Sequence, residues 1–412
     1  MPVPFSIVKL LARTGLARFV PRVRNTVGDC TCVLHQVSDR MLATPLDTIG
    51  DLTDGLEGRD EGCIDLASDA VLPMFVDSKP SRLSSHPSPV AGLLSLRQAI
   101  ALKTECTTGI NYDIEEEILV THGARDSLRI ILDSFVNPGD HVVLLDPSPP
   151  MMVDGLRHAR AYVRWLPAKC EHGELILQPD QLLRAFAGAK MVCLNLSANP
   201  MGGRWRECDL EMVADAAKRF DVLVVWHWEG DRSAAMPSIL RSRQLIIGQG
   251  ADHVGWMAAD CSLVKPCAVS AMISSSTVSP TEQMHAADIL GSKPPTFPAL
   301  LRRHVDTRLH ALGLEPIDND EGSYVWLDVR CYGIDGREFA EKLADTQNVL
   351  VLPGDRCGPS GTDFVRLTLC HDEKLLREGL RRIWAFVHAI FPDRPELDEV
   401  DEPESGAGRN AA

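Results

Sequence analysis

The feature that most constrains the fold is an alternation of short apolar runs with helical patterns through the middle of the chain. Strand-like and helical segments follow one another at residues 117–123, 124–136, 141–147, 151–159, 189–197, 209–220 and 221–228. That alternation is typical of βαβ units around a mostly parallel sheet. The run DVLVVW at residues 221–226 is apolar at consecutive positions, as expected of a strand that helices cover on both faces.

The pattern changes after about residue 300, where a second unit is expected. Helical patterns at residues 299–312, 337–347 and 373–390 surround strand-like runs at 323–330, 349–355 and 364–370. The sequence therefore predicts an α/β protein with a large, mostly parallel domain and a smaller α+β domain. The expected division is an N-terminal arm and the start of the small domain at 1–60, the large domain at 61–300, the small domain at 301–392 and an acidic tail at 393–412.

The two ends of the chain differ in charge. Residues 1–25 hold five lysines and arginines and no acid, which fits either an organelle transit peptide or an amphipathic arm that packs on a partner subunit. We favour the arm, because the segment is poor in serine and contains three prolines. Residues 393–412 are acidic and almost free of large hydrophobic side chains, a composition that predicts a disordered tail.

Composition excludes several classes of function. The net charge of −15 would repel nucleic acid, and no run of basic residues is interleaved with aromatics. No apolar run is long enough to span a membrane. The 12 cysteines form no zinc-binding pattern, so we expect reduced thiols in a cytoplasmic protein. The G-x-G of residues 248–250 lacks a third glycine, since position 253 is histidine, which excludes a dinucleotide fingerprint.

Four motifs in fixed order carry a family resemblance. They are ILVTHGARDSL (118–128), VNPGDHVVLLDPSPPM (136–151), LNLSANPMGG (194–203) and VLVLPGDRCGPSGTDFVRLTL (349–369), with SYVWLDV at 323–329 before the last. Together they resemble the class I/II aminotransferases, which are fold-type-I pyridoxal-phosphate enzymes. The similarity covers most of residues 90–390 and implies that fold.

The resemblance also implies roles for retained residues. The turn Gly123-Ala124-Arg125 opens a helix whose free N–H groups suit the cofactor phosphate, although it could equally be an ordinary βα turn. Asn199 matches the asparagine that bonds the pyridine hydroxyl, although Asn-Pro is also a common loop dipeptide. Arg366 matches the arginine that binds the substrate carboxylate, and an arginine in an apolar strand is costly unless paired.

The chain departs from the family at the Schiff-base lysine. Family members carry S-x-S-K, with the lysine eight residues before an arginine in a run ending R-x-G-aromatic. Matching HVGW to that ending places His253 at the arginine and Leu245 at the lysine. An alternative alignment places Gln249 at the lysine. No lysine occurs between Lys218 and Lys265, so either alignment predicts that the internal aldimine and its catalytic base are missing.

Further cofactor contacts differ in the same direction. His227 stands where an aspartate pairs with the pyridinium nitrogen, and a neutral imidazole holds that nitrogen protonated far less well. Trp226 and Trp228 flank it and are expected to fill the space that a cofactor needs. Pro149 and Gly230 replace aromatic residues of the family. These changes predict that pyridoxal phosphate is not bound covalently, and that it is not bound at all if the space is filled.

The leading hypothesis is a pseudo-aminotransferase that has lost transamination. It would form a homodimer, or a heterodimer with an active paralogue, and would bind a small carboxylate at Arg366. One alternative is an atypical aminotransferase that uses Lys265, although its Val-Lys-Pro setting indicates a strand end beyond the site. Another is altered metal- or His-based chemistry. The candidate residues match no metal motif, so no metal site is expected: His227, Glu229, Asp231, Asp252, His253 and Cys261.

Overall fold

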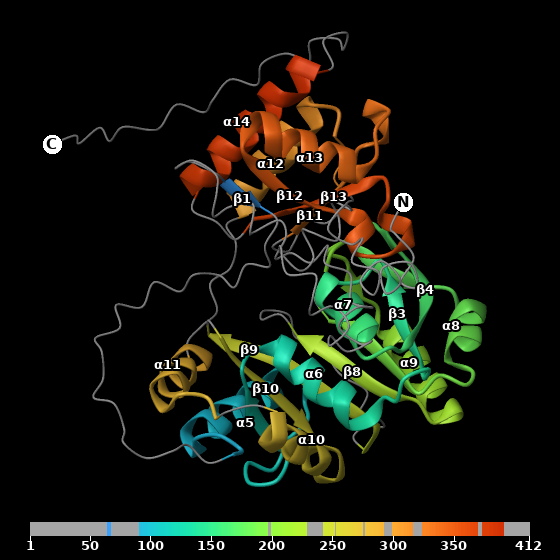
Figure 1. The fold of residues 1–412 in the computed structure, drawn as a ribbon, viewed down its shortest axis with the longest axis vertical. Helices are drawn as coiled ribbons and strands as arrows, with labels where there is room; N and C mark the ends of the chain where they lie inside the picture. Colours follow the sequence, from blue (N-terminus) through green and yellow to red (C-terminus); the bar gives the residue numbers. More distant parts are fainter. Residues whose placement is uncertain are drawn as a thin grey trace, which may run out of the picture.

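The computed structural model describes most of the chain between residues 64 and 390 (Figure 1). The described residues are 64–66, 90–196, 199–228, 242–251, 253–274, 277–291, 299–314, 316, 324–369 and 373–390. The predicted N-terminal arm and the acidic tail lie outside them. Among these residues no helix has both the length and the apolar character needed to cross a membrane.

A nine-stranded sheet forms the centre of the larger unit. In spatial order its strands are β2 (Ile118–Thr121), β10 (Val254–Ala259), β9 (Gln244–Ala251), β8 (Leu223–Trp228), β6 (Met191–Asn195), β3 (His141–Asp146), β4 (Tyr162–Glu171), β5 (Glu174–Leu177) and β7 (Arg204–Trp205). The run from β9 to β4 is parallel, whereas β10 is antiparallel to both of its neighbours. The predicted α/β class with a mostly parallel large sheet is confirmed.

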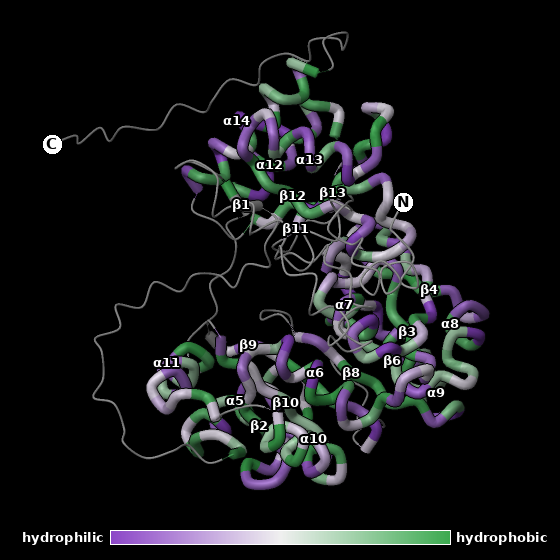
Figure 2. Tube along the Cα trace, viewed as in Figure 1, coloured by the Kyte–Doolittle hydropathy of each residue, from purple (hydrophilic) through white to green (hydrophobic). Residues whose placement is uncertain are grey.

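Helices cover both faces of this sheet. One face packs on α6 (Ala124–Phe135), α7 (Pro150–His158) and α10 (Cys261–Ser274). The other packs on α5 (Leu94–Thr108), α8 (Pro179–Phe186), α9 (Glu207–Phe220) and α11 (Pro280–Leu290). Figure 2 shows mostly hydrophobic central strands, which agrees with their burial. Successive strand side chains therefore enter two separate apolar cores.

The smaller unit is a four-stranded sheet with helices packed on it. Its strands lie in the order β1 (Ile64–Leu66), β12 (Val349–Pro353), β13 (Phe364–Thr368) and β11 (Tyr324–Asp328). Helices α12 (Ala299–Ala311), α13 (Gly336–Gln347) and α14 (Glu373–Ile390) complete its core. One predicted boundary is wrong: Ile64 pairs with Val349 and belongs to this core, so the large domain does not begin at residue 61.

Polar contacts between four pairs of described residues join the two units where β3 and β6 end. Ser360 donates to Asp146 through its backbone N–H and its hydroxyl, and the Ser148 N–H donates to the Cys357 carbonyl. The other two contacts are an ion pair between Arg356 and Asp154 and a hydrogen bond from Arg366 to Asn199. The loops after β12 and before β13 therefore lie against the carboxyl edge of the large sheet.

Candidate functional site

The predicted site residues come together at the carboxyl edge of the parallel strands. His227 lies near the end of β8, Gln249 near the end of β9, and Asn199 in the loop that follows β6. Parallel strands end at the same edge of a sheet, which is where ligands bind in open α/β folds. Gly123 joins them from the turn between β2 and α6.

A tight turn fixes the start of α6. Gly123 has a φ of 87° and is the N-cap of the helix, a left-handed conformation that favours glycine. Its carbonyl accepts hydrogen bonds from the Thr121 hydroxyl and the Ser127 N–H. Gly255 of β10 packs directly against it, because a Cβ on Gly255 would lie 2.2 Å from the Gly123 carbonyl carbon. The close approach of two glycines therefore holds the first turn of α6 against the β9–β10 hairpin.

The two candidate lysine positions lie in different environments. Leu245 pairs with Val225 near the start of β9 and is fully buried in the core beneath α6 and α7. Gln249 pairs with Gly255, and its Oε1 lies 3.9 Å from the place that a Cβ on Gly123 would occupy. The structure thus brings Gln249, and not Leu245, to the helix terminus that the family resemblance assigns to the cofactor phosphate.

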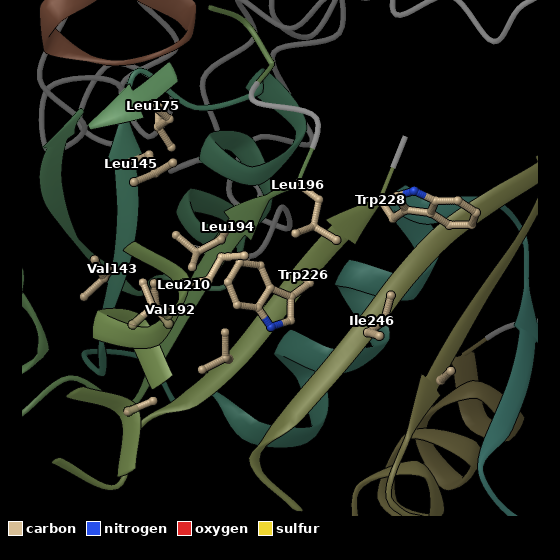
Figure 3. Close-up of a cluster of buried hydrophobic side chains, with 14 of the residues drawn as sticks. Val143, Leu145, Leu175, Val192, Leu194, Leu196, Leu210, Trp226, Trp228 and Ile246 are labelled. Atoms are coloured by element: carbon tan, nitrogen blue, oxygen red, sulfur yellow. The ribbon is translucent and has the colours of Figure 1, made fainter. Parts of the chain in front are cut away.

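The two tryptophans beside His227 lie on the opposite face of β8. Trp226 and Trp228 belong to the core that packs on α5, α8, α9 and α11, and Figure 3 shows both indoles among the buried side chains of this cluster. Val225, two residues before His227, belongs to the other core, so the His227 side chain starts on the face that carries α6 and α7. The expectation that both indoles fill the cofactor's space is wrong, because strand side chains alternate between faces. His227 itself is buried, with 3% of its surface exposed.

Asn199 and Arg366 form a direct contact between the two units. Arg366 Nη1 donates to Asn199 Oδ1 at 2.9 Å, and both side chains are buried. The guanidinium lies 4.6 Å from the centre of the Tyr324 ring, a cation–π arrangement. An acceptor and an aromatic face thus stabilise the buried arginine that sequence analysis singled out.

Lys265 does not lie at a strand end, although its Val-Lys-Pro setting predicted one. It lies in α10, is exposed, and its Nζ pairs with Glu116 Oε2 at 3.3 Å. Glu116 precedes β2, whereas Gly123 follows that strand, so the ion pair holds Lys265 at the opposite end of β2 from the turn. In this structure Lys265 does not meet Gln249, His227 or Asn199 at the carboxyl edge.

The remaining predicted residues are scattered or lie outside the described chain. The His253 side chain is exposed, and its carbonyl lies 3.7 Å from the Gly123 β-position. Pro149 is the N-cap of α7, and Ala124 and Arg125 begin α6. Glu229, Gly230, Asp231 and Asp252 are among the residues not described. Within the described ranges, no group of three or more His, Cys, Asp and Glu residues could hold a metal ion.

Sequence reasoning missed a charged cluster beside this edge. Arg356, only 5% exposed, donates from Nη2 to Asp154 Oδ2 of α7 at 3.0 Å. Burial raises the pKa of Asp154, and the nearby Arg356, Arg157 and Arg125 partly oppose that shift. Burial likewise raises the pKa of Asp146, against the hydrogen bonds from Ser360. The only sequence signal was an arginine inside the PGDRCG turn, which does not reveal a partner 202 positions away.

These residues fit only part of a pyridoxal-phosphate site. The open N-cap of α6 and the Asn199 side chain suit a phosphate and a hydroxyl group. At the positions that the family resemblance assigns to the lysine and to the carboxylate at the ring nitrogen, this chain has the carboxamide of Gln249 and the imidazole of His227. The described residues therefore do not fit a covalently held cofactor.

Comparisons with known proteins agree with this architecture. The chain is 26% identical to arginine–pyruvate transaminase AruH of Pseudomonas aeruginosa over 325 residues, which cover 73% of this chain and 82% of that protein. It is also 26% identical to methionine aminotransferase of Escherichia coli, over 72% of this chain and 83% of that protein. The structure of N-succinyldiaminopimelate aminotransferase from Mycobacterium tuberculosis shares the fold, with a TM-score of 0.71, 21% identity and coverage of 85% and 100% of the two chains.

The family model for aminotransferase class I and II matches residues 80–226 and 296–383. The two matched segments together exceed half of the 412 residues. They leave out residues 227–295, the part that contains His227, Gln249 and Lys265. The chain belongs to the class I and II aminotransferase family.

Proposed function

We propose that this protein has lost pyridoxal-phosphate-dependent transamination and instead binds a small carboxylate through Arg366. The observation that supports the proposal is the position of Gln249, one of the two residues aligned with the family's lysine, whose carboxamide lies beside the N-cap of α6 at the carboxyl edge of the sheet. A carboxamide neither forms an imine nor shuttles protons as an amine does. With an imidazole at His227, the chain also lacks a second group that transamination needs, the carboxylate that keeps the cofactor ring protonated.

A visible absorbance spectrum with added pyridoxal phosphate tests the loss of cofactor chemistry. We expect the spectrum of free cofactor, and no peptide that borohydride has modified in mass mapping. A specific lysine that borohydride has linked permanently to the cofactor would overturn the proposal. Modification at Lys265 in particular would revive the alternative that this lysine acts as a surrogate, and Lys265→Ala would then be expected to abolish activity.

Carboxylate binding is tested with pyruvate, because a curated relative is named as an arginine–pyruvate transaminase. Arginine offers two parallel hydrogen bonds to a carboxylate, and Arg366 is presented by β13 next to Asn199. We expect pyruvate to raise the Tm of the wild-type protein and to leave that of Arg366→Gln unchanged. No rise in Tm with pyruvate, succinate or acetate would remove the ligand-binding part of the proposal.

Dimer formation is the third part of the proposed function. By family resemblance the site lies at a subunit interface, and the partner would be a second copy or an active paralogue. Light scattering of the purified chain tests the homodimer. If the chain is monomeric by itself, the heterodimer is favoured. If it stays monomeric when the paralogue is added, both the homodimer and the heterodimer are overturned.

The proposed location is the cytoplasm. The eight cysteines that the structure describes are free, which fits a cytoplasmic protein.

A further inference from the structure

The outer face of α14 carries basic side chains at helical spacing together with one tryptophan. Five exposed residues, here named the basic stripe, recur at intervals of three and four: Lys374, Arg377, Arg381, Trp384 and His388. That spacing places them on one side of the helix. Sequence analysis found no basic run interleaved with aromatics. The members of the stripe are not consecutive in the sequence, because core-facing residues of α14 separate them.

Positive charge exceeds negative charge around the stripe. Arg377 pairs with Glu373 at 2.7 Å, while Glu378 serves both Arg381 and Arg382. Hydrogen bonds from the two arginines lower the pKa of Glu378 to about 2, so that this carboxylate stays charged. Apart from the buried Arg302, α12 and α14 hold six lysines and arginines against three carboxylates, in a chain with a net charge of −15.

The neighbouring helix extends the basic surface. Arg377 Nη1 lies 3.0 Å from His304 Nε2 of α12, and Arg303 of the same helix is exposed. Trp384 stacks on His388 with ring centres 3.9 Å apart and keeps 41% of its surface exposed. Tryptophan and arginine are both enriched among the residues that contribute most binding energy in protein interfaces.

A complementary sequence follows this helix directly. Residues 393–404, DRPELDEVDEPE, contain seven acidic residues and one arginine, and α14 ends at Ile390. An extended chain covers about 3.3–3.6 Å per residue, so the six residues from Ile390 to Glu396 reach about 20 Å. Arg381 lies about 14 Å back along the helix from Ile390, at 1.5 Å per residue. The acidic residues from Glu396 onward are therefore within reach of the stripe.

We propose that the acidic segment 393–404 binds the basic stripe of its own chain. Its carboxylates would lie opposite Lys374, Arg377 and Arg381, and Leu397 or Val400 would contact Trp384. Carboxylate–guanidinium pairs supply the attraction, which salt at physiological strength weakens and does not abolish. This inference concerns a different surface from the Arg366 site and does not depend on the proposed function.

Carbodiimide cross-linking of the full-length protein tests the contact. The reagent joins a carboxylate to a nearby lysine, and Lys374 is the only lysine of the stripe. We expect peptides that join Lys374 to residues 393–404, recovered from monomeric protein. Lys342, which pairs with Glu338 on α13, is the control and should join to Glu338 instead. Absence of the Lys374 product, or its recovery only from covalent dimers, would overturn the proposal.

Proteolysis provides a second readout that does not depend on lysine chemistry. A glutamate-specific protease should cleave after Glu396–Glu404 about fivefold faster when the triple variant Lys374→Gln, Arg377→Gln, Arg381→Gln removes the pairing charges. The matched control Arg184→Gln, Lys218→Gln, Arg219→Gln neutralises three exposed cations on α8 and α9. Equal cleavage rates in the two variants would overturn the proposal. If the stripe variant does not fold, the wild type is tested in added salt instead. We expect salt to accelerate cleavage of the wild-type tail, and the absence of any acceleration would contradict the proposal.

Discussion

Arg366 of β13 donates a hydrogen bond from Nη1 to Oδ1 of Asn199 at 2.9 Å, although the two residues are 167 positions apart and Asn199 lies in the loop after β6 of the other sheet. Arg366 is fully buried and Asn199 is 2% exposed. A guanidinium stays charged at any ordinary pH, so its burial depends on acceptors such as this one. The bond therefore ties β13 to the loop after β6 and holds the edge of the large sheet in place.

Arg366→Gln should destabilise the protein by about 2–4 kcal/mol, because a shorter amide cannot reproduce the buried bond or the stacking on Tyr324. Urea denaturation of the purified variant measures this change. Arg330→Gln is the matched control, since its side chain is 65% exposed and should cost less than about 1 kcal/mol. Equal losses in the two variants would show that Arg366 has no special structural role.

Gln249→Lys should restore an amine at the carboxyl edge, because residue 249 lies beside the N-cap of α6. Incubation with pyridoxal phosphate and borohydride should label residue 249 in peptide mapping. Leu245→Lys is the contrasting variant: it places an amine in a fully buried core and should unfold the protein rather than bind the cofactor. Labelling at neither position, in a folded Gln249→Lys protein, would contradict the assignment of Gln249.

Gly255→Ala should destabilise the protein strongly, by about 2–4 kcal/mol, because the added Cβ would lie 2.2 Å from the Gly123 carbonyl carbon. Backbone atoms cannot move aside as a flexible side chain can. Thermal unfolding compares it with Gly291→Ala, whose Cβ would meet nothing closer than 3.5 Å at an ordinary φ of −75°. A Tm for Gly255→Ala as high as that of the control would refute the close approach.

Ser360→Ala should destabilise the protein by about 1–2 kcal/mol at neutral pH and by less in acid. In the folded protein, burial holds the pKa of Asp146 above its ordinary value of 3.8. The contribution of this carboxyl to stability is therefore greatest below pH 3.8, and it is lost as the pH rises from 3.8 through the raised pKa. Removing the Ser360 hydroxyl takes away a bond to the ionised form and raises the pKa further. Urea unfolding of Ser360→Ala and wild type, at neutral pH and below pH 3.8, measures how the loss in free energy of unfolding depends on pH. In a protein that also carries Asp146→Asn, that loss should no longer depend on pH.

Much of the fold could be predicted because its signals are local. The run HVVLLDP became β3, the pattern at residues 373–390 became α14, and consecutive apolar residues correctly indicated a strand covered on both faces. The sequence does not predict β5 and the edge strand β7, because they are only four and two residues long. Ile64 was misplaced since nothing in a three-residue strand tells which sheet it joins.

The candidate site was predictable in its parts but not in its contacts. Gly123, Asn199 and Arg366 were found from motifs, and the structure joins the last two directly. The choice between Leu245 and Gln249 needed the register of β9 against β8 and β10, which spacing alone does not supply. The ion pair of Arg356 with Asp154 could not be foreseen, because its partners are 202 positions apart and meet through the packing of the two units.

The separation of Trp226 and Trp228 from His227 by the plane of β8 has a consequence for engineering. Residues on the α5 side of β8 pack in one apolar core, while Val225 on the α6 side packs in the other and His227 lies beyond it, near the carboxyl edge. A substitution at His227 therefore leaves the two indoles packed as before, whereas a polar residue at Val225 or Leu245 would disrupt the core on the α6 side. A designer could rebuild the chemistry at this edge through the strand ends alone, on a scaffold whose two cores stay intact.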